Sequence, residues 1–216
     1  KYGLTPLHFA CWRTAWHNGA SLEVVNALLK AWPDAAKEKN EDGHTPLHYS
    51  CRGALEVVAA LLNVWPDAVK EKDRYGNTIL HMACCQGGAS LEEIALLLNT
   101  WLSYKENKTN SAMSSLHCSS NWDTSNCTED VKMLFSHLFS LCSNNTHNHS
   151  PKEIMEYFIR IKLWNGTTLV LDRHPTVIKT IDLGTKVMAD FLSMTGRCCN
   201  LATMWEVLRN EQDLLE

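Results

Sequence analysis

The feature that most constrains the fold is a four-residue motif that recurs along the first half of the chain. Thr-Pro-Leu-His stands at 5–8 and at 45–48, and it returns as Thr-Ile-Leu-His at 78–81. The copies begin 40 and 33 residues apart, and a glycine precedes each copy by two residues. Self-similarity at such a period is typical of repeat proteins, in which each unit packs against its neighbours along a solenoid.

Each copy predicts a tight turn followed by a short helix. The segment 40–43, Asn-Glu-Asp-Gly, is rich in turn-forming residues, and its glycine can adopt a positive φ without strain. Thr45 is a suitable N-cap, and Pro46 suits the first helical position because its missing N–H would have no partner there. The motif therefore marks the start of the first helix in each unit.

A second helix is predicted in every copy. Ser21 and Ser90 are suitable N-caps for it, while Pro33 and Pro66 end it directly after a tryptophan. Its apolar residues have helical spacing: Val24, Val25, Leu28, Leu29 and Trp32 in the first copy, Val57, Val58, Leu61, Leu62 and Trp65 in the second, and Ile94, Leu97, Leu98 and Trp101 in the third. We expect the three tryptophans to stack in the core between neighbouring second helices.

Together these features closely resemble the ankyrin repeat, which has a G-x-T-P-L-H turn, an inner helix, an outer helix rich in V-V-x-x-L-L, and a connector. The resemblance covers residues 3–101. Trp-Pro-Asp-Ala at 32–35 and 65–68 replaces the Gly-Ala-Asp of many ankyrin repeats, and the loop between the two helices varies in length. The resemblance implies an all-α, ankyrin-type solenoid of stacked helix-turn-helix units with short turns. It also implies that the motif's histidine is a structural hydrogen-bonding residue, at His8, His48, His81 and His117.

The predicted organisation extends this solenoid to residue 142. The repeats are 1–39, 40–72, 73–106 and a degenerate copy at 107–142, in which Ser114–His117 takes the place of the motif and 129–135 forms the outer helix. A polar loop follows at 143–150. Residues 151–216 are expected to hold a further degraded unit, with Ile154, Tyr157, Phe158 and Ile161 on a helix, and then a helical C-terminal cap. Because Lys1 already falls in the turn of the first copy, we expect further repeats or another domain upstream.

Composition narrows the classes of function. The formal net charge is −4 and no basic stripe is present, so nucleic acid is not an expected partner. The sequence has no run of 18 apolar residues, so no membrane span is predicted. Three of the nine cysteines recur at one inner-helix position, which favours reduced thiols and a cytoplasmic location, with the nucleus as an alternative. Five Asn-x-Ser/Thr sequons leave open a secreted, glycosylated module.

No motif of catalysis or cofactor binding is present in the sequence. It contains no G-x-S-x-G, no phosphate-binding glycine loop and no H-E-x-x-H. Histidines and cysteines crowd residues 117–149, but without the spacing of a zinc site. We therefore predict no cofactor, no metal and no enzymatic activity.

The resemblance implies a monomeric protein-binding module whose partner lies on the turns and inner helices. The residues it places on that face are Trp12, Arg13, Trp16, Glu41, Asp42, His44, Tyr49, Arg52, Arg74, Tyr75, Asn77, Met82 and Gln86. Tyrosine, tryptophan and arginine are the residue types most enriched in binding hot spots. Trp12 and Trp16 have no counterpart in the other copies, so they either contact the partner or cover one end of the stack. The alternative function is a regulatory or targeting segment of a larger enzyme or channel.

Overall fold

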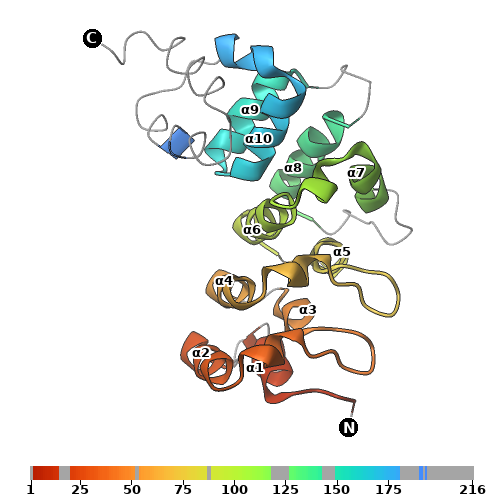
Figure 1. The fold of residues 1–216 in the computed structure, drawn as a ribbon, viewed down its shortest axis with the longest axis vertical. Helices are drawn as coiled ribbons and strands as arrows, with labels where there is room; N and C mark the ends of the chain where they lie inside the picture. Colours follow the sequence, from red (N-terminus) through yellow and green to blue (C-terminus); the bar gives the residue numbers. More distant parts are fainter. Residues whose placement is uncertain are drawn as a thin grey trace. The chain divides into compact units, whose positions relative to one another are not determined.

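The computed structural model describes residues 2–14, 20–51, 54–86, 89–117, 127–142 and 149–180, together with residues 190, 191 and 193. These residues form helices and contain no strand (Figure 1). The chain gathers into two compact units. The first unit comprises Lys1–Tyr104 with Ser115–Met133, and the second comprises Lys105–Ser114 with Leu134–Glu216.

The first unit is built from helix pairs, each with an inner and an outer helix. The inner helices are α1 (Pro6–Thr14), α3 (Pro46–Ser50) and α5 (Ile79–Gln86), and the outer helices are α2 (Leu22–Ala31), α4 (Leu55–Val64) and α6 (Leu91–Trp101). Inner helices pack against inner helices and outer against outer from one pair to the next, so that the pairs form successive layers (Figure 1). The predicted all-α solenoid of stacked helix-turn-helix units is confirmed for this unit.

The helices of the first unit begin where the sequence predicts. Thr45 is the N-cap of α3 and forms a capping box with His48. Ser90 caps α6 by accepting a hydrogen bond from the Glu93 N–H at 3.1 Å. Before α3 the turn glycine Gly43 has a φ of +79°, and Gly76 has a φ of +84° before α5. The predicted positive φ of these glycines is therefore confirmed.

The repeated positions of the inner helices form the core between layers. The motif's leucine is almost fully buried in each copy, and so is the recurring cysteine. These residues are Leu7, Leu47 and Leu80, with Cys11, Cys51 and Cys84. Burial raises the pKa of the Cys11 thiol to about 12, so this cysteine packs as a small neutral residue.

The prediction that three tryptophans stack in the core is wrong for two of them. Trp32 is 47% exposed and Trp65 is half-buried, whereas Trp101 is 7% exposed. Trp32 and Trp65 directly precede Pro33 and Pro66, and a proline disfavours helical backbone at the residue before it. The two prolines open the short 3₁₀ helices η1 (Pro33–Lys37) and η2 (Pro66–Lys70). Trp32 and Trp65 accordingly have φ near −145° and leave the apolar stripe, while Trp101 stays inside α6.

The helix that follows η3 (Lys105–Lys108) has a different register from the predicted one. Residues 114–117, expected to open an inner helix, form the last turn of α7 (Asn110–His117). The helix begins earlier because the Thr109 hydroxyl accepts a hydrogen bond from the Ala112 N–H at 3.2 Å, the capping role of a helix-opening threonine. Helix α8 (Glu129–Ser140) does cover the predicted outer helix at 129–135.

The second unit contains α9 (Pro151–Arg160) and α10 (Trp164–Arg173), which pack against each other and against η4 (Pro175–Thr180). The sequence predicts α9, but it gives no sign of α10. A Cβ built on Gly166 would lie 2.7 Å from the Leu163 Cδ2 and 2.9 Å from the Phe158 Cδ2. Glycine thus permits the close approach of α10 to α9, which compensates for the weak helix propensity of this segment.

The division into units differs from the predicted boundary at residue 142. The second unit already includes Lys105–Ser114 and the segment from Leu134 onward. Arg173 joins these segments, because its guanidinium donates hydrogen bonds to the carbonyl oxygens of Leu141 and, at 3.0 Å, of Lys108. The predicted repeat boundaries stay a prediction. Residues 143–148 of the polar loop predicted at 143–150 lie outside the described residues, and so do the predicted cap helices beyond residue 180, apart from the three residues named above.

Candidate functional site

Two polar side chains fix the shape of the turns that precede α3 and α5. The Asn40 Oδ1 accepts hydrogen bonds from the backbone N–H groups of Asp42 (3.0 Å) and His44 (2.8 Å). Asp73 repeats this arrangement, since its Oδ1 accepts from the N–H groups of Tyr75 and Asn77, both at 2.8 Å. The sequence-based list missed both residues. The sequence feature that could have identified them is an Asn or Asp three positions before each turn glycine.

Neighbouring turns are joined to each other. The Arg74 N–H donates to the Asp42 carbonyl at 3.0 Å, and the Glu41 N–H donates in the same way to the Tyr2 carbonyl at 3.2 Å. The Arg74 side chain strengthens the first of these links through an ion pair between its Nη1 and the Asp42 Oδ1 at 2.9 Å. The same guanidinium lies over the Tyr75 ring, 4.8 Å from its centre. The turns therefore form a continuous, internally bonded edge.

The motif's histidine locks each turn to the helix that follows it. The Nδ1 of His8 lies 3.1 Å from the Thr5 backbone N–H, which can only donate, so Nδ1 accepts and the proton is on Nε2. That Nε2 then donates to the His44 carbonyl of the next repeat at 3.1 Å. His48 accepts from the Thr45 N–H with the same geometry. His81 accepts from the Thr78 N–H in the same way, so the structural role that the resemblance implies is seen for these three histidines. The side chain of His117 lies outside what the structure describes, so its role stays a prediction.

The buried environment keeps these histidines neutral. Burial, with a smaller effect of the neighbouring His44, lowers the pKa of His48 from 6.5 to about 4. Burial also lowers the pKa of His8 and of His81. A proton on Nδ1 would face the donating N–H of the preceding threonine, so protonation is incompatible with the native turn.

His44 connects two repeats across the face. Its Nε2 lies 3.4 Å from the Asp73 Oδ2, and its ring stacks on His48 with centres 5.6 Å apart. Burial by itself would raise the pKa of the Asp73 carboxyl, but hydrogen bonds from Asn77 and Tyr75 outweigh it and keep that pKa below its ordinary value. Asp73 is therefore ionised at neutral pH and holds the turn as an anion.

Aromatic rings line the inner helices next to this edge. The ring centres of Phe9 and Trp12 lie 6.2 Å apart, those of Trp12 and Tyr49 lie 6.4 Å apart, and those of Tyr49 and His44 lie 5.5 Å apart. Phe9 and Trp12 are each 45% exposed, although both are large apolar side chains. We call Phe9, Trp12, Tyr49 and His44 the aromatic row. Hot spots of protein interfaces are rich in such side chains.

The structure brings together most of the described residues that the sequence placed on this face. Trp12, His44 and Tyr49 meet in the aromatic row, and Asp42, Arg74 and Tyr75 meet at the turns. Asn77 joins them by donating from its Nδ2 to the Asp73 Oδ2 at 3.0 Å. The exposed Glu41 stands in the turn, and the half-buried Met82 takes the position in α5 that Phe9 and Tyr49 take in α1 and α3.

Four predicted residues cannot be placed in this way. Trp16 and Arg52 lie outside the described residues. Arg13 and Gln86 belong to α1 and α5, but their side chains lie outside what the structure describes. Their part in the face stays a prediction.

Comparison with known families agrees with this architecture. Residues 2–38 and 42–71 match the family model of the ankyrin repeat. These residues are therefore ankyrin repeats, and ankyrin repeats are generally protein–protein interaction modules. The third helix pair lies beyond the match but repeats the glycine turn and the contact between Thr78 and His81. No curated protein matches the chain.

Two features are absent from the described residues. None of their helices is both long and apolar enough to traverse a bilayer. Within the same ranges, no three side chains of His, Cys, Asp or Glu are grouped so that they could hold a metal ion.

Proposed function

We propose that this chain is a non-catalytic scaffold or adaptor that binds another protein through its turns and inner helices. The observation that carries the proposal is the aromatic row, which exposes large rings on a rigid edge. The polar side chains of that edge already bond to one another, as in the pairs of Arg74 with Asp42 and His44 with Asp73. The exposed rings are thus the groups left to make contacts with a partner.

The rigidity of the edge favours binding. Ordering side chains and loops on association opposes binding, so a preformed surface loses less free energy when its partner arrives. Hydrogen bonds from Asn40 and Asp73 fix the turns, and the motif's histidines fix the turns to the helices. We infer a monomer, located in the cytoplasm or nucleus, where thiols such as Cys51 and Cys84 stay reduced.

The test is affinity capture with the whole chain as bait in an extract of the cells that produce it. One bait carries Trp12→Ala and Tyr75→Ala, which truncate exposed rings on the proposed face. Its matched control carries Glu23→Ala and Glu92→Ala, which remove exposed side chains from the outer helices α2 and α6. Each anchor should contribute on the order of 1–3 kcal/mol, so the face variant should lose the partner while the control retains it. Equal recovery with both baits would contradict the proposal.

A further inference from the structure

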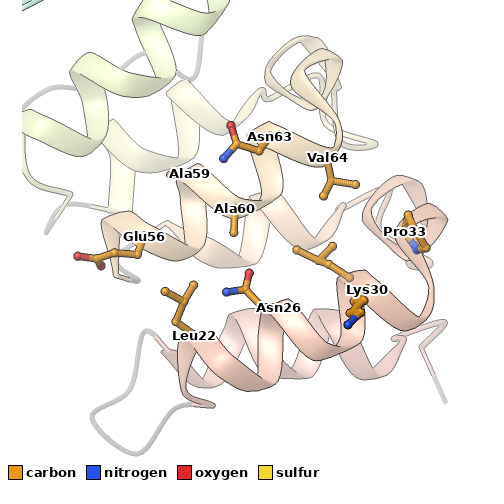
Figure 2. Close-up of a pocket in the computed structure, with 10 residues that line it drawn as sticks. Leu22, Asn26, Lys30, Pro33, Glu56, Ala59, Ala60, Asn63 and Val64 are labelled. Atoms are coloured by element: carbon orange, nitrogen blue, oxygen red, sulfur yellow. The ribbon is translucent and has the colours of Figure 1, made fainter.

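A groove lies between the outer helices α2 and α4. Figure 2 shows it between the two helices, with Leu22 and Glu56 near the end where both helices begin, and with Lys30 and Val64 near the opposite end. Its volume is about 530 Å³, which is within the range of small-ligand sites. The apolar part of its lining includes Leu29, Ala59 and Ala60, and the two small alanine side chains leave space for the groove.

Four polar side chains border this apolar lining: Asn26 and Lys30 from α2, and Glu56 and Asn63 from α4 (Figure 2). Within the described part of the chain, none of the four makes a hydrogen bond or an ion pair. The turn edge is different, because its Asn, Asp and Arg side chains are bonded to one another. The groove therefore offers two amides and two opposite charges that are available to a ligand.

The order of these groups matches one kind of ligand. A side-chain amide both donates and accepts, as a peptide group does, so Asn26 and Asn63 can bond to the backbone of an extended chain. The two charges lie near opposite ends of the groove, because Glu56 is at the same end as Leu22. Lys30 follows Leu22 by eight helical residues, so the groove is about 12 Å long between these ends. An extended peptide rises about 3.3 Å per residue, so it covers this distance in about four residues.

We propose that the groove between α2 and α4 is a second binding site, which takes a short extended peptide with a basic and an acidic side chain about four positions apart. The basic side chain pairs with Glu56, the acidic one with Lys30, and the peptide backbone bonds to Asn26 and Asn63. Small apolar side chains of the peptide lie against Ala59 and Ala60. This site is separate from the aromatic row and does not depend on the function proposed for it.

The test is selection from a phage-displayed library of random octapeptides, with the whole chain as bait. Enriched peptides should carry one basic and one acidic residue three to five positions apart. With Lys30→Glu both ends of the groove are acidic, so the selected peptides should carry two basic residues. With Glu56→Lys both ends are basic, so they should carry two acidic residues. Glu23→Lys is the matched control: Glu23 takes the same helical position in α2 as Glu56 in α4 but does not line the groove, so selection should not change.

A synthetic peptide from the first selection then measures the two kinds of contact. Exposed charge pairs are weak, so Lys30→Ala should reduce its affinity about two- to fivefold. Asn26→Leu combined with Asn63→Leu should reduce it about tenfold, since two backbone hydrogen bonds are lost. Trp12→Ala should leave it unchanged, which separates this site from the proposed face.

Three results would overturn the proposal. The library gives no enriched sequence, or the charge variants select the same peptides as the unaltered chain. Alternatively, the chain forms a concentration-dependent dimer that Lys30→Glu dissociates in sedimentation experiments, in which case a second copy fills the groove instead of a peptide.

Discussion

At the scale of single residues, the fold depends on a few side chains that repeat with the motif. The threonine caps its helix, the histidine accepts from the threonine N–H, and the glycine takes a positive φ. Each of these roles is local, so each can be tested by one substitution in a chain that otherwise keeps its contacts.

Gly43 and Gly76 form a matched pair for such a test. Both have a positive φ, which is unfavourable for alanine by roughly 1–2 kcal/mol. A Cβ on Gly43 would also lie 3.0 Å from the Arg74 backbone nitrogen, whereas a Cβ on Gly76 would meet no atom within 4 Å. Urea unfolding should therefore show that Gly43→Ala lowers the free energy of unfolding by about 1 kcal/mol more than Gly76→Ala does. Equal losses would mean that the neighbouring turn moves aside freely.

Acid should destabilise the first unit through its histidines. The pKa of His48 is about 4 in the folded chain against about 6.5 in the unfolded chain. Below pH 6.5 the unfolded state binds a proton that the folded state does not, so stability falls as the pH drops to about 4, by about 3 kcal/mol from this residue. His48→Gln should be less stable at pH 7 because the contact with Thr45 is lost, yet it should depend less on pH. If the free energy of unfolding varied with pH in the same way for His48→Gln and for the unaltered chain, a group other than His48 would cause the pH dependence.

At the scale of helices, sequence predicts the elements that open with strong caps and misses the one whose sequence does not favour a helix. The caps at Thr45 and Ser90 were correctly expected because a capping side chain acts within one turn. Ser21 does stand at the N-cap position of α2, but its side chain makes no capping hydrogen bond there. Helix α10 was missed because its glycine and β-branched residues form a helix only when packed against α9. The predicted start of α7 was wrong. The prediction relied on the weak likeness of 114–117 to the motif and overlooked Thr109, which is the better N-cap.

Gly166 tests the packing of α9 against α10. Gly166→Ala raises intrinsic helix propensity, but its methyl group would lie within 3 Å of Phe158 and Leu163. Overpacking of this kind is unfavourable by about 1–3 kcal/mol, so hydrogen exchange in both helices should become faster. Asp172→Ala, an exposed change in the same helix, should leave the exchange rates unaltered. Slower exchange in Gly166→Ala would show that propensity, not packing, controls this pair.

At the scale of the whole molecule, the sequence predicts which residues share the face of the turns and inner helices better than it predicts what surrounds that face. The residues of the face follow from the repeat, because equivalent positions fall on equivalent sides of each layer. Asn40 and Asp73 were missed because their role depends on backbone groups that they contact only after the turn has formed. The groove between α2 and α4 was missed because it is a property of two helices from different repeats, and its residues have no spacing that marks them in a single repeat.

The most direct test of the proposed binding face is hydrogen exchange of the chain alone and in complex with the protein that affinity capture identifies. Exchange should slow at residues 40–50 and 73–86, which hold the turns and the inner helices α3 and α5, and it should change little in α9 and α10. Slowing confined to the outer helices, or to the second unit, would contradict the account.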